Sequence, residues 1–255
     1  MSIFQAVIFG IVEGITEFLP ISSTGHLILT ARTLGLFPPS EFLKTFEIAI
    51  QLGAILAVVV LYAKTMILDK EVLKRVLASF LPTAIIGFAF YKTIKTFLLG
   101  NDQVVLGALL LGGIGIIVLE TFYKSKEPCI KEMKDLTYWQ AVLIGVFQSI
   151  ALLPGVSRSA ATIMGGLALG VNRKTIVEFS FLLAIPTMVA ATGLDLIKSA
   201  SHFSQEEMFL LAVGLSVSFL VAIGSIKFLL YFIKRHDFVV FGIYRILIAV
   251  LFLMV

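Results

Sequence analysis

The sequence predicts an all-α integral membrane protein with about six transmembrane helices and two re-entrant helix–loop–helix hairpins in an inverted-topology repeat. Three observations predict this fold. Hydrophobic residues make up 59% of the 255 positions and charged residues only 14%, whereas soluble domains are about 45–50% apolar. Six long segments are almost wholly apolar, and two further apolar segments are interrupted by proline near the middle.

The six uninterrupted segments are long enough to cross a bilayer as helices, because about 20 residues span its hydrocarbon core. They cover about residues 42–63, 76–97, 103–122, 175–197, 208–231 and 238–255. The formal net charge of +4 is typical of loop lysines that face anionic lipid headgroups. We therefore expect membrane lipids as partners and no nucleic acid.

The two interrupted segments cover about residues 3–34 and 140–171, with Pro20 and Pro154 near their middles. Proline ends a helix, and the hydroxyl residues that follow it can cap a new one. Irregular backbone at membrane depth is tolerated only against protein or a water-filled cavity. Each segment is therefore predicted to be a re-entrant hairpin, and its polar residues are predicted to have a function.

Basic residues predict the orientation, because connections rich in lysine and arginine stay in the cytoplasm. The basic connections are 64–75, 123–138, 173–174 and 234–235. The intervening connections, near 92–102 and 198–207, are poorer in basic residues. This threading puts both termini outside, with the first hairpin open to the outside and the second open to the cytoplasm.

The two halves of opposite orientation also resemble each other, which indicates a duplication. Pro20 and Pro154 lie 134 positions apart, and the run Lys44 to Glu47 recurs, one residue longer, as Lys174 to Glu178. We expect a single membrane domain, 1–255, with a first repeat at about 3–122 and a second at about 140–255. Inverted repeats are common in transporters, with the binding site at the repeat interface near the midplane.

Two acids lie on one helix face of the first hairpin, because Glu13 and Glu17 are four residues apart. Two carboxylates at such a short distance repel each other unless a divalent cation, a basic partner or a shared proton lies between them. Mg²⁺ and Ca²⁺ prefer carboxylate oxygens and readily bridge to phosphate. Both residues are therefore predicted catalytic acids and metal ligands.

A cluster of hydroxyl groups follows the proline of the first hairpin, at Ser22, Ser23 and Thr24. Gly25 allows close backbone approach, and His26 lies within reach of Ser23 as a general base or acid for a seryl nucleophile. The alternative is that the hydroxyls only cap the next helix and that His26 is a buried polar group. Two acids, the three hydroxyls after Pro20 and a histidine within fourteen residues favour function. Ser22, Thr24 and Gly25 are predicted to bind the substrate.

The second hairpin offers a cation instead, because Arg158 is flanked by Ser157 and Ser159. A guanidinium can hold two phosphate oxygens at once, and a helix that begins there points backbone N–H groups at the same anion. Gln148 stands where the first hairpin has Glu13. These four residues are predicted to bind the substrate. The alternative is that Arg158 only neutralises an acid of the first hairpin.

Other polar residues lie inside the predicted spans. Glu47 and Gln51 share one helix face, and we expect them to support the site through hydrogen bonds between helices. Glu178 is the repeat partner of Glu47. Arg245 is predicted to be structural, either paired with Asp237 or snorkelling to the membrane surface.

The motifs EGITEFLPISSTGH (Glu13 to His26) and PGVSRS (Pro154 to Ser159) resemble the two signatures of the undecaprenyl-diphosphate phosphatase family, the bacitracin-resistance type. The likeness covers essentially the whole chain. It implies a phosphatase of a bacterial inner membrane that hydrolyses a C55 isoprenoid diphosphate to the monophosphate and phosphate, which recycles the lipid carrier for cell-wall synthesis. It also implies an inverted-repeat fold, dependence on a divalent cation and a homodimer.

The resemblance implies a role for each matching residue. Ser23 matches the proposed nucleophile and His26 the residue that exchanges its proton. Glu13 and Glu17 match the essential acids, and Arg158 matches the phosphate-binding arginine. We expect catalysis to face outward, because the threading places the acid-rich hairpin on the outer side.

A second hypothesis is a transporter, either a lipid-phosphate flippase or a small-anion carrier, because inverted repeats and broken helices are common there. A carrier needs binding groups but no nucleophile beside a base. The cluster of Ser22, Ser23, Thr24 and His26 next to paired acids therefore favours the enzyme.

Overall fold

The computed structural model describes residues 1–93, 98, 101–123, 130–199 and 204–253, and these residues are almost entirely helical. Five helices are long and apolar enough to cross a membrane. They are α3 (Glu41–Leu68), α4 (Lys70–Ala89), α6 (Asp102–Tyr123), the first 21 residues of α9 (Arg173–Ser199) and α10 (Gln205–Phe232). The expectation of an α-helical, multi-pass membrane protein is confirmed.

The predicted boundaries need two corrections. Helix α4 begins six residues earlier than predicted, because the Asp69 side chain accepts a hydrogen bond from the Val72 N–H and caps the helix there. The sixth predicted span, 238–255, contains α11 (Val239–Phe252), which has only 14 residues. A helix of that length extends for about 21 Å, less than the thickness of the hydrocarbon core. We predicted six full-length spans, and the described part of the chain contains five.

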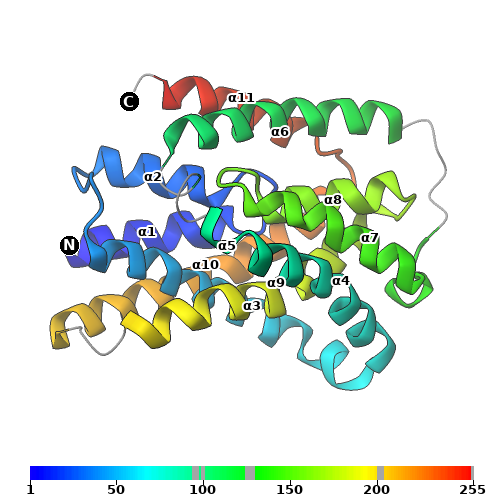
Figure 1. The fold of residues 1–255 in the computed structure, drawn as a ribbon, viewed down its shortest axis with the longest axis horizontal. Helices are drawn as coiled ribbons and strands as arrows, with labels where there is room; N and C mark the ends of the chain where they lie inside the picture. Colours follow the sequence, from blue (N-terminus) through cyan, green and yellow to red (C-terminus); the bar gives the residue numbers. More distant parts are fainter. Residues whose placement is uncertain (94–97, 99–100, 124–129, 200–203, 254–255) are drawn as a thin grey trace.

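Both interrupted segments fold as two helices joined by a turn (Figure 1). The first pair is α1 (Ile3–Thr16) and α2 (Ser23–Thr33), and the second is α7 (Tyr138–Ser149) and α8 (Arg158–Ala168), with a short 3₁₀ turn, η3 (Ile150–Leu152), after α7. The second helix of each pair is capped by a serine side chain, from Ser22 and from Ser157. Both serines have positive φ, +73° and +21°, a conformation that non-glycine residues rarely adopt and that is common at functional sites.

Glycines allow the helices of one half to cross those of the other closely. On α1, a Cβ atom at Gly10 would lie 2.7 Å from the Gly214 carbonyl oxygen of α10. On α7, a Cβ atom at Gly145 would collide with the Ser79 carbonyl oxygen of α4. Such close backbone approach is how membrane helices gain packing energy in the absence of a hydrophobic driving force. Each hairpin therefore packs on a long helix of the opposite half.

Helices α6 and α11 cross at a reciprocal glycine pair. A Cβ atom at Gly113 would lie 2.7 Å from the Gly242 carbonyl oxygen, and one at Gly242 would lie 2.7 Å from the Gly113 carbonyl oxygen. The two helices lie side by side at the upper edge of the molecule in Figure 1. The remaining described elements are short: α5 (Tyr91–Thr93) and η2 (Met133–Asp135).

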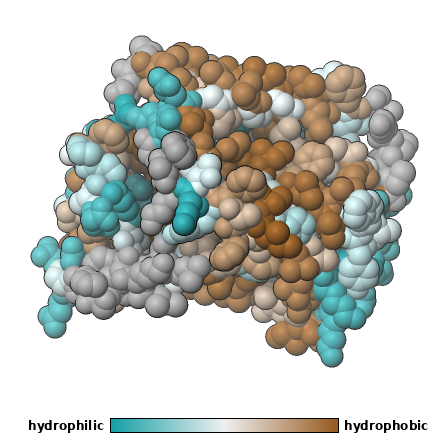
Figure 2. Space-filling model, in the orientation of Figure 1, coloured by the Kyte–Doolittle hydropathy of each residue, from teal (hydrophilic) through white to brown (hydrophobic). Residues whose placement is uncertain are grey.

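The polar surface is concentrated at two ends of the molecule, and Figure 2 shows hydrophobic side chains across the middle between them. The start of α1 and the end of α11 both lie toward the left in Figure 1, and the α3–α4 connection lies at the right. Three contacts hold basic connections together at this second end. Arg75 Nε donates to the Leu136 carbonyl, Thr175 Oγ1 donates to the Lys131 carbonyl, and Glu120 pairs with Arg173. The predicted basic loop residues at 124–129 lie outside the described residues.

Candidate active site

The tips of the two hairpins meet at a cavity of about 180 Å³, which is also lined by α3, α4 and α9. Eight of the residues singled out from the sequence line this cavity. They are Glu17, Ser22, Ser23, Thr24, Gln51, Gln148, Ser157 and Arg158. Residues from the two halves of the chain therefore share one polar space, as the predicted repeat requires.

A continuous chain of hydrogen bonds crosses the cavity from one hairpin to the other. Ser23 Oγ donates to Glu17 Oε2 over 2.8 Å, and Arg158 Nη2 donates to Glu17 Oε1 over 3.0 Å. The Arg158 and Glu17 side chains are only 9% and 4% exposed. Arg158 therefore pairs with an acid of the first hairpin, as the alternative interpretation expected, and this pairing does not exclude the predicted binding of an anion. A buried, hydrogen-bonded ion pair of this kind fixes the positions of both groups.

Arg158 is held rigidly from a second side. Its Nη1 donates to the Ser180 carbonyl over 2.9 Å and to the Ser180 hydroxyl over 3.3 Å. Its Nε is buried and has no hydrogen-bond partner. Because an unpaired buried donor is costly, this N–H is available to an anion that enters the cavity. Sequence reasoning missed Ser180, which no motif marks.

Serines on either side of Arg158 join the two loops. Ser157 and Ser159 share a hydrogen bond of 2.9 Å, and Ser159 Oγ donates to the Leu19 carbonyl of the first hairpin over 2.9 Å. Ser159 is fully buried and does not line the cavity. Its observed contact is therefore to the opposite loop, which differs from the predicted contact with substrate.

Glu13 lies behind the cavity, fully buried on α1. Neither carboxylate oxygen has a hydrogen-bond donor as a partner, and the Glu17 carboxylate lies close enough for the two acids to share a proton. Because burial of an unpaired carboxylate is very costly, the two acids fit either a shared proton or a divalent cation. The described residues contain no cluster of three or more metal-ligating side chains, so a cation there would take its other ligands from water or phosphate.

His26 does not contact Ser23. Its Nδ1 lies 2.7 Å from the Ser22 carbonyl oxygen, which can only accept, so Nδ1 carries the proton. Its Nε2 lies 2.8 Å from the Tyr244 hydroxyl, and the two rings stack with their centroids 5.6 Å apart. The predicted contact between His26 and Ser23 is therefore absent, because the helix turns the imidazole toward α11. The group that accepts the Ser23 proton in this geometry is Glu17.

The far wall of the cavity contains amide and hydroxyl groups that sequence reasoning recognised only in part. Gln148 Nε2 donates to Thr83 Oγ1 over 2.9 Å and to Thr187 Oγ1 over 3.2 Å, and all three residues line the cavity. Gln148 Oε1 is buried without a partner. Polar residues beside prolines inside α4 and α9 (Pro82 and Pro186) were the signal that could have identified the threonines.

Three other residues that the sequence singled out, Gly25, Glu47 and Glu178, do not line the cavity. An added Cβ atom at Gly25 would lie 3.2 Å from the Leu109 side chain. Glu47 is partly buried near Glu13. Glu178 lies 3.9 Å from Lys174 in an ion pair between helical neighbours.

Arg245 is structural, as predicted, but its partners differ from those predicted. It is fully buried, so it does not snorkel. Its guanidinium donates to the carbonyls of Ala108 (2.8 Å) and Leu109 (3.4 Å) in α6. It also donates to Gly155 in the second hairpin (3.1 Å) and to Pro20 in the first (3.5 Å). Arg245 therefore holds both loops from behind through their backbone oxygens.

Comparison with known proteins shows the family of the chain. The family model for the bacitracin resistance protein BacA matches residues 6–251. The undecaprenyl-diphosphatase of Aquifex aeolicus (strain VF5) is 55% identical over 252 residues, which are 99% of this chain and 98% of that protein.

Two further relatives have the same printed name. The undecaprenyl-diphosphatase of Sulfurihydrogenibium sp. (strain YO3AOP1) is 51% identical over 99% of this chain and 98% of that protein. The one from Thermus thermophilus is 46% identical over 99% of this chain and 97% of that protein. The chain therefore belongs to the bacitracin resistance protein BacA family.

Proposed function

We propose that this protein hydrolyses undecaprenyl diphosphate to undecaprenyl phosphate and phosphate. The observation that carries the proposal is the cavity itself, where the Ser23 hydroxyl donates to the Glu17 carboxylate beside the Arg158 guanidinium. The relatives at 46–55% identity are named for this reaction. A nucleophile, a proton acceptor and a phosphate-binding cation are the parts that phosphoryl transfer needs.

Each residue of the site has a separate role in the proposed reaction. The Ser23 oxygen attacks the terminal phosphorus, its proton passes to Glu17 Oε2, and the bond from that phosphorus to the bridging oxygen breaks. Undecaprenyl phosphate leaves, and water then cleaves the phosphoseryl ester and releases phosphate. Arg158 stabilises the charge on the phosphoryl oxygens through its Nε and the ion-paired side of its guanidinium. His26 positions the loop through its hydrogen bonds to the Ser22 carbonyl and the Tyr244 hydroxyl, and it does not take part in the proton transfer from Ser23.

A divalent cation, Mg²⁺ or Ca²⁺, completes the proposed site. Glu13 and Glu17 would hold it, because Glu13 has two buried and unpaired oxygens. Bound there, the cation would neutralise the charge of the diphosphate. Chelation followed by addition of each metal, with phosphate release as the readout, tests this assignment.

We further propose that the chain is an inverted-topology repeat of two halves and that each helix pair is a re-entrant hairpin. Two pairs of contacts support this. Gly10 and Gly145 are 135 positions apart, and so are their contact partners Gly214 and Ser79. The crossing of Gly113 and Gly242 is reciprocal, as a twofold relation between the two halves would require.

The proposed site faces outward in a bacterial inner membrane. Support comes from the basic connections, which share the end of the molecule opposite the termini. In that location the reaction would recycle the lipid carrier for cell-wall synthesis. A membrane-impermeant reagent added only outside sealed cells should block the activity, and full protection from it would contradict the orientation. The homodimer stays a prediction.

A lipid-phosphate flippase or anion carrier is the alternative. The same paired helix crossings support it, because inverted repeats are common in transporters. The two are separated by detergent-solubilised protein, which has no sealed membrane to transport across. Phosphate release from undecaprenyl diphosphate that is lost in Ser23→Ala supports the enzyme. Release that is unchanged in Ser23→Ala, or absent from the unaltered protein, would contradict it.

A further inference from the structure

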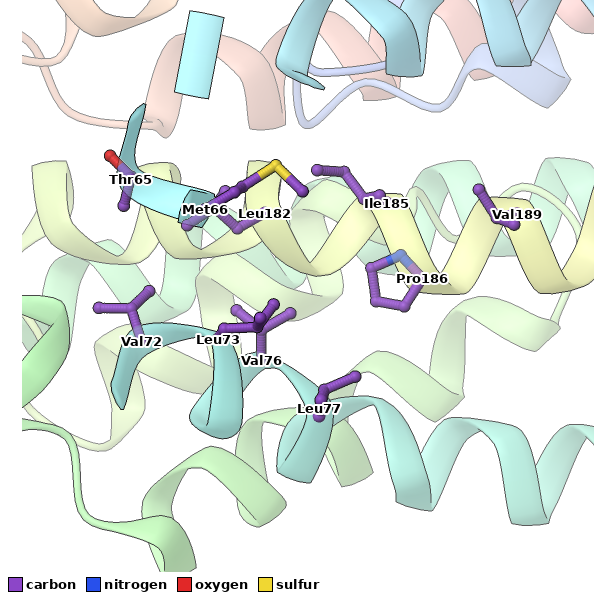
Figure 3. A pocket seen from close by; sticks show the side chains of 10 residues that line it. All are labelled: Thr65, Met66, Val72, Leu73, Val76, Leu77, Leu182, Ile185, Pro186 and Val189. Atoms are coloured by element: carbon purple, nitrogen blue, oxygen red, sulfur yellow. The ribbon is translucent and has the colours of Figure 1, made fainter. Parts of the chain in front are cut away.

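An apolar groove of about 200 Å³ lies between α4 and α9, at the end of α3. Figure 3 shows Val72, Val76 and Leu77 of α4 pointing toward α9, and Pro186 of α9 pointing toward α4. Leu182 and Ile185 of α9 also line the groove. Thr65 is the single polar residue among those that line it. Leu77 is 48% exposed, so the groove opens to the side of the molecule, where lipid lies.

The corresponding seam, between α3 of the first half and α10 of the second, is closed. There α3 packs directly on α10, because Gly53 abuts the Leu215 backbone and Gly214 abuts Phe46 and Ile50. The pair α4 and α9 instead contains a proline in each helix, Pro82 and Pro186. Proline removes a helical hydrogen bond and bends the helix. The groove is therefore a specific difference between two related seams.

The groove and the polar cavity are neighbours along the same two helices. On α9, Pro186 lines the groove and the next two residues, Thr187 and Met188, line the cavity. On α4, Leu77 lines the groove and Thr83 lines the cavity, about 9 Å apart along a helix. A molecule with a polar head and an apolar chain could therefore occupy both spaces at once.

We propose that the groove binds the part of the polyisoprenyl chain that follows the diphosphate group. This inference rests on the proposed function and deepens it, because it assigns the site that recognises the hydrocarbon chain. Apolar walls on both sides favour a hydrocarbon chain, and the proximity of the polar cavity favours one that carries a diphosphate group. The diphosphate lies at Ser23 and Arg158, and the chain leaves between α4 and α9 toward the lipid.

Groove-filling variants test the proposal. Leu77→Trp and Ile185→Trp add a large ring from opposite walls, and Ile85→Trp is the control, because Ile85 is 66% exposed on α4 outside both spaces. The substrates are undecaprenyl diphosphate and a five-carbon prenyl diphosphate, whose chain is too short to reach the groove. For the two groove variants, the ratio of kcat/KM for the long substrate to that for the short one should fall on the order of tenfold.

An unchanged ratio in both groove variants, or an equal fall in Ile85→Trp, would overturn the proposal. A photoreactive undecaprenyl diphosphate provides a second measurement that needs no turnover. It should label α4 and α9 peptides at the groove, and excess undecaprenyl phosphate should remove the label. Label elsewhere, or label that only bulk phospholipid displaces, overturns the groove. Labelling without any phosphate release would overturn the proposed function alone.

Discussion

The two hairpin loops have the same backbone design and opposite chemistry. Ser22 and Ser157 are 135 positions apart, both cap a helix, and both have positive φ. The next residue is Ser23 in one loop and Arg158 in the other. The same position therefore holds the predicted nucleophile in the first half and the predicted phosphate-binding cation in the second.

The difference teaches how a duplicated scaffold can form one asymmetric site. Glu13 of α1 and Glu17, which follows that helix, correspond to Gln148 and Leu152 in the second half. Negative charge is thereby confined to the first hairpin, and positive charge is supplied by the second. An anionic substrate between them is attacked from one side and held from the other. Symmetric chemistry would have placed like charges together, at a high electrostatic cost.

The largest expected effect comes from the two corresponding positions themselves. Ser23→Ala removes the attacking oxygen and Arg158→Ala removes the cation, so each should lower kcat/KM by on the order of 10³-fold or more. Phosphate release from undecaprenyl diphosphate in detergent measures this. Ser149→Ala is the matched control, because its hydroxyl donates only to the Gly145 carbonyl within α7. A loss of activity in the control equal to that of Ser23→Ala would break the comparison.

A comparison of Glu17 with His26 sharpens the assignment of the proton acceptor. Glu17→Gln keeps the shape of the group that accepts from Ser23 but removes its basicity, so kcat should fall on the order of 10²-fold or more. His26→Gln should cost about tenfold or less, because the imidazole contacts Ser22 and Tyr244 instead. Steady-state kinetics of both variants decide between them. The reverse order of effects would restore His26 as the base.

Variants of Arg245 test whether catalysis requires the two loops to be held in fixed positions relative to each other. Arg245→Met leaves the carbonyls of Pro20 and Gly155 without this donor, and each unsatisfied buried acceptor costs about 1–3 kcal/mol. We expect kcat to fall on the order of 10²-fold, as for a small misplacement of reacting groups, with KM changed less. Arg245→Lys should recover part of the lost kcat. A variant with a lower unfolding temperature but unchanged kcat would show that Arg245 only stabilises the fold.

The smallest effects concern packing and should be alike in the two halves. Gly10→Ala and Gly145→Ala each place a methyl group against a carbonyl of the facing helix, so each should lower the free energy of unfolding by about 1–3 kcal/mol. Gly107→Ala is the control, because no atom lies within 4 Å of its added Cβ, and it should raise stability by about 0.5–1 kcal/mol. Thermal unfolding in detergent measures all three. A large effect in only one half would break the structural equivalence.

Much of the site follows from the sequence, because chemistry that is costly in a membrane is visible there. Glu17, Ser23 and Arg158 stand out in apolar segments, and all three line one cavity. The contacts that these three residues make could not be predicted from the sequence. Ser23 is three residues from His26 in sequence, yet its hydrogen bond is to Glu17, because the loop between α1 and α2 turns it back toward the first helix. Ser180 carries no motif and is recognised only by its contacts with Arg158.

By itself, the sequence determined the class of protein, the two breaks at Pro20 and Pro154, and the ends of the molecule that bear basic residues. These follow from composition, proline geometry and charge, which act locally. The tertiary structure alone decided that each hairpin packs on a long helix of the opposite half, that Arg245 reaches both loops, and that α4 and α9 enclose an apolar groove. The reason is physical: lipid and the surface of a neighbouring helix are equally apolar, so hydrophobicity cannot specify which partner a membrane helix will choose.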